Sequence, residues 1–228
     1  MTDFLGTAWL VLQKDFAIEV KSREILYTTL VFAVSCILIF SFAFVSEGGQ
    51  PLAGAAAGIL WIAIAFAGTL ALGRTFERER YGDTVRALLL TPAPRSAIYF
   101  GKLLGMVVLM LGTEVVVVPL IALLFHVPLF DQLLLLAGLL LPGTVGFAAV
   151  GTLFAAMLIR AQTRGVMLWI VLFPITVPVM IAGVRGTAAL LEPMPETAVA
   201  IMWISLLAAF DAVFLTLALW TFEPVMTE

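Results

Sequence analysis

Two carboxyl side chains are the strongest candidates for chemistry in this chain, because each stands at the centre of a long apolar stretch. Glu114 lies within residues 103–125 and Asp211 within residues 197–222, and no Lys or Arg lies deep in either stretch. A lone carboxylate at the centre of a bilayer costs roughly 2.5 to 3.5 kcal/mol, which favours the neutral acid. The two acids therefore either face an internal seam, where they share a proton or meet a partner subunit, or form packing hydrogen bonds to neighbouring helices.

The common catalytic and metal-binding patterns are missing from the sequence. There is one histidine, and the one cysteine, Cys36, falls inside an apolar stretch, so we expect neither a metal site nor a disulfide framework. No Gly-x-x-x-x-Gly-Lys-Ser/Thr loop is present to hold nucleotide phosphates. We therefore expect a protein that is not an enzyme by itself and that would depend on a separate ATPase subunit for any use of ATP.

The composition is that of a membrane protein. Of the 228 residues, 63% are hydrophobic and 12% are charged, against about 25% charged in a soluble domain. A membrane-spanning helix needs about 20 apolar residues. The chain is therefore predicted to be one all-α, multi-pass membrane domain over residues 1–228, with no cleaved signal peptide. The six predicted spans are residues 25–45, 51–73, 103–125, 132–159, 165–184 and 197–222.

The basic residues predict the orientation of the six spans. Eleven of the twelve Lys and Arg residues fall before the first span, between the second and third, or between the fourth and fifth, and only Arg185 falls in an opposite loop. By the positive-inside rule these three segments and both termini are cytoplasmic. The net charge of −3 gives no reason to expect a nucleic-acid partner.

Residues 1–24 are predicted to form an amphipathic helix at the membrane surface. Charged residues alternate there with an apolar stripe at helical spacing, which is typical of a helix lying in the interface. The alternative is a simple anchor that only fixes the start of the first span. The stripe consists of Leu5, Ala8, Trp9, Leu12, Phe16 and Val20.

The connection between the second and third spans, residues 74–102, is the least membrane-like part of the chain. Its first part is a charged helical end that Gly82 interrupts. A short helix over residues 83–90 follows, which either Asp83 or Thr84 can cap. Pro92 lies beyond this helix, where it stops helical continuation. Such a helix could transmit force from a soluble partner, or the segment could be a solvated loop whose arginines only enforce the topology.

The last part of this connection, residues 95–102, is predicted to be an amphipathic entry into the third span. Tyr99 suits the membrane interface.

The order of these features resembles the coupling-helix region of type-2 ABC exporter permeases. A Glu-Arg-Glu run precedes Gly82, a leucine-rich helix follows, and Thr91-Pro92 and Lys102 come after it. In that family this region docks on a nucleotide-binding subunit. The resemblance implies that the residues coupling to the ATPase are Glu77, Arg78, Glu79, Gly82, Asp83, Arg86, Leu89, Thr91, Pro92, Arg95 and Lys102.

Two further segments are similar to the CcmB family, the haem exporter B subunits of cytochrome c maturation. They are LQKDFAIEVKSRE at residues 12–24 and LFPITVPVMIAG at residues 172–183. The resemblance implies an inner-membrane permease, forming a homodimer, that handles haem as a substrate and uses ATP through its partner. The implied partners are a CcmA-like ATPase, CcmC-like and CcmD-like membrane subunits and a CcmE-like periplasmic haem chaperone. No role is assigned to the acidic tail at residues 223–228.

Three other functions stay open from the sequence. The chain could be a type-2 exporter permease for a drug, lipid or polysaccharide. It could be an intramembrane enzyme or ion-coupled carrier that uses Glu114 and Asp211, or it could be a structural scaffold of a larger complex.

Pro174 and Pro178 lie four residues apart in the fifth span, and each removes a backbone donor. Thr176 is a candidate to restore the lost hydrogen bonds. We expect either a deformable or discontinuous span at a functional interface or a static packing kink.

His126 is a candidate for haem ligation at the outer end of the third span, since haem iron is commonly held by His. A turn-forming surface residue is the alternative. If haem is handled, the ligating histidines belong to partner subunits.

Overall fold

The computed structural model describes residues 4–45, 52–81, 94–157 and 164–225, and nearly all of these residues are helical. The prediction of an all-α fold is therefore confirmed. The elements are α1 (Phe4–Ser22), α2 (Glu24–Ala43), the 3-10 turn η1 (Ala53–Ala55), α3 (Ala56–Tyr81), α5 (Arg95–Phe125), α6 (Leu133–Met157), α7 (Arg164–Leu190) and α8 (Thr197–Val225).

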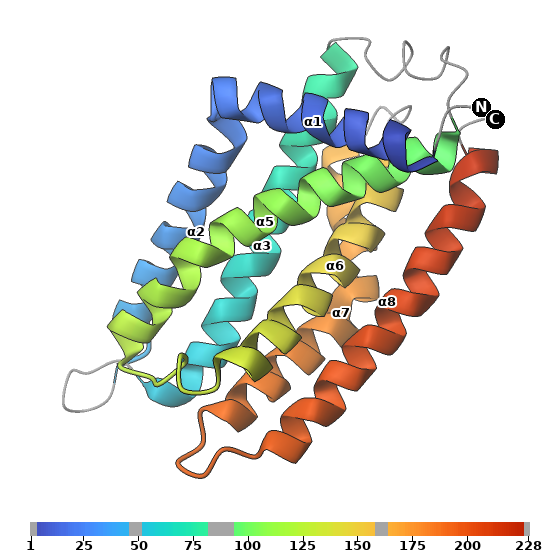
Figure 1. Ribbon diagram of the computed structural model, residues 1–228. Helices are drawn as coiled ribbons and strands as arrows, with labels where there is room; N and C mark the ends of the chain where they lie inside the picture. The colour runs from blue at the N-terminus through green and yellow to red at the C-terminus, as the bar shows by residue number, and fades with distance from the viewer. Residues whose placement is uncertain (1–3, 46–51, 82–93, 158–163, 226–228) are drawn as a thin grey trace.

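Six of these segments are long and apolar enough to cross a membrane, as predicted. They run alongside one another, whereas α1 lies across one end of the bundle (Figure 1). The last turn of α3, the first turn of α5 and the last turn of α8 lie at this same end, which we call the α1 end. The six segments are Glu24–Ala43, Ala53–Thr75, Arg95–Phe125, Leu133–Met157, Ile170–Leu190 and Thr197–Thr221.

Two predicted boundaries were wrong. The stretch 95–102 is not a separate entry segment, because α5 is one continuous helix from Arg95. The fifth span reaches Leu190, so Arg185, predicted in a loop, is an exposed residue within α7. Beyond residue 184 this helix packs on α6, where Gly186 lies close to Leu139.

Trp61 of α3 joins three helices in the centre of the bundle. Its side chain is 1% exposed, and its ring lies so close to Gly143 of α6 and Gly183 of α7 that a Cβ atom at either glycine would overlap it. Its Nε1–H donates a hydrogen bond of 3.0 Å to Thr187 Oγ1 of α7. Since membrane helices associate through close packing and a few hydrogen bonds, this residue fixes how α3, α6 and α7 pack.

Tyr99 is a core residue and not the interfacial residue that the sequence predicted. It is completely buried, and its hydroxyl donates a hydrogen bond of 2.9 Å to the carbonyl oxygen of Ala149. A buried tyrosine hydroxyl needs such a partner. The first turns of α5 are thereby joined to α6.

The helix α7 runs through Pro174 and Pro178 without interruption. Thr176 does donate hydrogen bonds within this helix, to the carbonyls of Leu172 at 2.9 Å and Phe173 at 3.3 Å. The carbonyls that each proline leaves without their usual donor lie four residues earlier, at positions 170 and 174. The expectation that Thr176 restores those bonds was therefore wrong.

Replacement of Trp61 tests its central role. We expect Trp61→Ala to lower the free energy of unfolding by about 3 to 5 kcal/mol. Trp61→Phe should lower it less, because one ring remains, although the bond to Thr187 and part of the contact with the two glycines are lost. Unfolding of the purified protein in mixed detergent and SDS micelles measures both. Trp220→Ala is the control, since Trp220 is 79% exposed. Equal losses in Trp61→Ala and Trp220→Ala would contradict the assignment.

Candidate functional site

The α1 end of the bundle is the candidate docking face, because α3 ends and α5 begins there (Figure 1). The backbone of residues 77–79 forms part of the last turns of α3, and the side chains of Glu77, Arg78 and Glu79 lie outside the described part of the chain. Their role in coupling stays a prediction. The same holds for the predicted coupling residues wholly outside the described ranges, which are Gly82, Asp83, Arg86, Leu89, Thr91 and Pro92.

Arg95 and Lys102 are the two predicted coupling residues whose side chains the structure describes. Arg95 is the first residue of α5 and is half-buried. Lys102 is only 8% exposed, and its Nζ lies 3.4 Å from Asp15 Oδ2 on α1. The ammonium group of Lys102 therefore faces α1 and is not presented at the docking face. A role of Lys102 in coupling stays a prediction.

The helix α1 is held closely on α5 beside this ion pair. Ala8 and Val11 are its buried residues. A Cβ atom at Gly101 would lie 2.6 Å from the carbonyl oxygen of Ala8 and 2.7 Å from Val11 Cβ. A small residue at position 101 is therefore what allows the two backbones to approach, as at other membrane helix contacts.

A backbone conformation and a hydrogen bond define the turn from α1 into α2. Arg23 adopts a left-handed backbone conformation with φ of 53°. Glu19 Oε1 accepts a hydrogen bond of 2.9 Å from the backbone N–H of Leu26, in the first turn of α2. A carboxylate in this position satisfies a helix N-terminal donor and is stabilised by the helix dipole. The backbone turn at Arg23 and the Glu19–Leu26 hydrogen bond together set the orientation of α1 relative to the first span.

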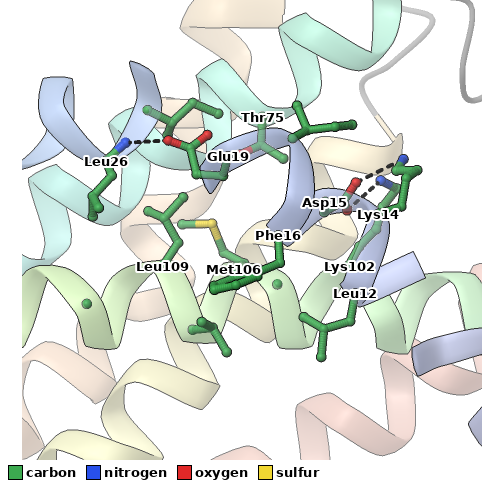
Figure 2. A pocket seen from close by; sticks show the side chains of 15 residues that line it. Leu12, Lys14, Asp15, Phe16, Glu19, Leu26, Thr75, Lys102, Met106 and Leu109 are labelled. Atoms are coloured by element: carbon green, nitrogen blue, oxygen red, sulfur yellow. Dashed lines mark hydrogen bonds and ion pairs between the residues drawn. The ribbon is translucent and has the colours of Figure 1, made fainter. Parts of the chain in front are cut away.

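A cavity of about 270 Å³ lies between α1, α2 and α5 (Figure 2). Thr75 near the end of α3 also lines it. The side chains of Leu12, Phe16, Met106 and Leu109 form an apolar wall, and charged residues of α1 and α5 stand at its edges. No local pattern of residues predicts this cavity, because its walls come from helices that are distant along the chain.

Glu114 is buried, with 4% exposure, and faces α6. Its Oε1 accepts a hydrogen bond from the hydroxyl of Thr144. The carboxyl group therefore has a polar partner on a neighbouring helix, which is one of the two arrangements expected from the sequence. A functional role for Glu114 stays a prediction.

Asp211 packs on another side of α6. It is 8% exposed, and a Cβ atom at Gly146 would meet its Oδ1 at 2.5 Å. Within the described residues that oxygen has no hydrogen-bond partner. Thr144 and Gly146 are two residues apart, which is about 200° around a helix. The structure thus places Glu114 and Asp211 against opposite faces of α6, so they do not form a pair that shares one proton directly.

His126 ends α5 with a left-handed backbone conformation, φ of 52°, and is exposed. This position turns the chain out of the helix. Among the described residues there is no cluster of three or more His, Cys, Asp or Glu side chains that could hold a metal ion. Haem ligation by His126 stays a prediction.

The Glu114–Thr144 hydrogen bond can be measured by a double-mutant cycle. We expect Glu114→Leu and Thr144→Val to show a coupling energy of about 0.6 to 1.7 kcal/mol, the range found for membrane hydrogen bonds. Unfolding in SDS micelles supplies the four free energies. In the control cycle Thr216→Val replaces Thr144→Val, because Thr216 is exposed on α8 and bonds within its own helix. Coupling no larger than in the control cycle would count against the bond.

A second substitution tests the contact between α1 and α5. We expect Gly101→Leu to displace α1 and to cost about 1 to 3 kcal/mol, the usual cost of overpacking. Hydrogen exchange of residues 4–22 should then rise. Gly105→Ala is the control for replacement of a glycine in α5, because a Cβ atom there would be 3.9 Å from its nearest neighbours. Unchanged exchange in Gly101→Leu would show that α1 does not depend on this contact.

Comparison with known proteins covers almost the whole chain. The family model described as CcmB protein matches residues 6–226. The chain is 29% identical over 189 residues to the Heme exporter protein B of Rhodobacter capsulatus, covering 81% of this chain and 86% of that protein. It is 27% identical over 208 residues to the Heme exporter protein B of Pseudomonas aeruginosa, covering 91% of each. This chain, a multi-pass membrane protein, belongs to the CcmB family.

Proposed function

We propose that this chain is the membrane subunit of an ABC transporter for cytochrome c biogenesis. In this role it couples ATP hydrolysis by a separate cytoplasmic ATPase to haem export or to release of a haem-loaded periplasmic chaperone. The observation that carries the proposal is the match of the CcmB family model to residues 6–226. Both relatives are named Heme exporter protein B, and this name supports haem as the substrate of the transporter.

The distribution of charge supports a cytoplasmic α1 end in a bacterial inner membrane. Lys14, Lys21, Arg23, Arg74 and Arg95 all belong to segments at this end of the bundle (Figure 1). An excess of Lys and Arg in short connecting segments is the main determinant of the cytoplasmic side. In this orientation the connection between α3 and α5 faces the ATPase, and both termini are cytoplasmic.

Coupling would start where α5 begins. The coupling segment predicted from the sequence leads directly into Arg95, so closure of the ATPase would displace the first turns of α5. These turns are tied to α6 through the Tyr99 hydroxyl and to α1 through the Lys102–Asp15 pair. The three elements would therefore move together. The displacement does useful work only if the ATPase binds the two conformations with different affinities.

The haem itself would be ligated mainly by other subunits, since this chain has one histidine. We therefore favour chaperone release over passage of haem through this subunit.

The complex would contain two copies of this chain with a CcmA-like ATPase, CcmC-like and CcmD-like membrane subunits and a CcmE-like chaperone. Glu114, Asp211, Pro174 and Pro178 are the intramembrane positions that could change between its conformations.

The coupling contact can be tested by affinity purification of the chain from its native host in mild detergent. We expect an ATPase subunit and haem-handling membrane proteins to copurify with the unchanged chain. Arg86→Glu should reduce the recovered ATPase at least tenfold, because it reverses a charge at the proposed contact.

Arg185→Glu is the matched control for that experiment, since it makes the same charge reversal at an exposed position in the half of α7 away from the α1 end. ATPase recovery should stay at the original level in this variant. Full recovery of the ATPase with Arg86→Glu would contradict the contact. Absence of any ATPase from the original complex would contradict the proposed function.

A further inference from the structure

The exposed residues of α7 within its span form a single stripe. With about 100° of rotation per residue, they all fall within about 100° around the helix axis, whereas the rest of α7 packs on α3, α6 and α8. The described helices therefore leave one face of α7 uncovered, which we call the α7 stripe. Its residues are Ile170, Pro174, Val177, Pro178, Ile181 and Arg185.

Arg185 places a positive charge on this stripe, in the half of α7 away from the α1 end. It lies five residues before Leu190, which is about 7.5 Å along the helix. Within the described part of the chain it has no ion-pair or hydrogen-bonding partner. Charged side chains in a span usually face the bundle interior and pair with another group. An exposed arginine here therefore fits a negative group on another molecule.

The same stripe carries a backbone carbonyl group without its usual donor. Pro178 has no N–H, so it donates no bond to the carbonyl of Pro174. This carbonyl lies 16 residues before Leu190, about 24 Å, and so within a hydrocarbon core about 30 Å thick. Thr176 bonds to other carbonyls, those of residues 172 and 173. Because lipid tails have no donor, a neighbouring helix is one of the few sources of the missing bond.

From the charge and the carbonyl group together we infer that the α7 stripe docks a membrane-spanning helix of another subunit. That helix carries a carboxylate at the level of Arg185 and a hydroxyl or amide donor at the level of Pro174. The two levels are 11 residues apart, about three helical turns, so both groups lie on one face of the partner helix. The inference rests on the proposed function, because it requires a complex with further membrane subunits.

A second copy of this chain complements the stripe less well. The acids in its described spans are Glu24, which lies at the α1 end, and Glu114 and Asp211, which are buried. None of them is exposed at the level of Arg185. A lipid phosphate could pair with Arg185, but it offers no donor at the level of Pro174. A helix with both groups matches the charge and the carbonyl at once.

Photocrosslinking in the complete complex, followed by purification from the native host in mild detergent, tests this surface. Benzoylphenylalanine replaces Ile181, which is 49% exposed within the stripe, or Leu206 of α8, which is 42% exposed and serves as the control. We expect only position 181 to crosslink to a spanning helix of another subunit that has the carboxylate and the donor at this spacing. Crosslinks from position 181 to a second copy or to lipid alone would overturn the inference.

Charge exchange tests the pairing with Arg185. Arg185→Glu should reduce recovery of the crosslinked subunit at least tenfold, whereas Arg185→Lys keeps the charge and should retain most of it. Replacing the partner's carboxylate with Arg should restore recovery in the Arg185→Glu complex. Full recovery with Arg185→Glu alone would overturn the contact, and absence of rescue would overturn the assignment of the carboxylate.

A pair of proline variants tests the carbonyl group. Pro178→Ala returns an N–H to the carbonyl of Pro174, so the partner's donor is no longer required there, and recovery of the partner should fall at least threefold. Pro119→Ala is the control, since Pro119 is also an exposed proline within a span but residues 115–125 contain no charge. Thermal unfolding verifies that both variants are folded. Equal recovery in the two variants would overturn the role of the carbonyl.

Recovery of the ATPase in the same purifications separates this inference from the proposed function. It should stay at the original level in Arg185→Glu, because Arg185 lies away from the α1 end. Loss of the partner helix with the ATPase retained is the expected result. Retention of both would overturn the docking stripe and leave the proposed function standing, whereas absence of ATPase from the unchanged complex would overturn the proposed function.

Discussion

The insertion of Trp61 between Gly143 and Gly183 is the contact on which the packing of the central helices depends. Lipid tails are as apolar as the side chains, so membrane helices gain little by hiding apolar surface from each other. They are held by close packing and by scattered hydrogen bonds. Trp61 supplies both, because its ring fills the space that two glycines leave and its Nε1–H bonds to Thr187. The arrangement of α3, α6 and α7 follows from this contact.

The helix α5 links this central packing to the α1 end. It contacts α1, α2, α3, α6 and α8. Its first turns carry Tyr99, which bonds to α6, and Gly101 and Lys102, which hold α1. A displacement at Arg95 would therefore reach both α1 and α6.

The helix α6 separates the two intramembrane acids. Glu114 has a hydrogen-bonding partner in Thr144, whereas Oδ1 of Asp211 packs on Gly146 and has none among the described residues. Similar positions at the centres of two spans thus have different environments. The environments differ because each acid contacts a different face of α6. The spacing of apolar residues along α5 or α8 does not predict which face that is.

The sequence by itself determined the all-α class, the six spans and the amphipathic helix over residues 4–22, because apolar length and helical periodicity are local properties. The positions of the Lys and Arg residues likewise predicted which connecting segments and termini lie on the same side of the membrane. Tertiary structure decided that Tyr99 is a core residue, that Lys102 faces Asp15, and that α7 extends past Arg185. Each of these depends on which residue of another helix lies opposite, such as Ala149 for Tyr99. Contacts between residues far apart in the chain have no local signal, so only the folded bundle shows them.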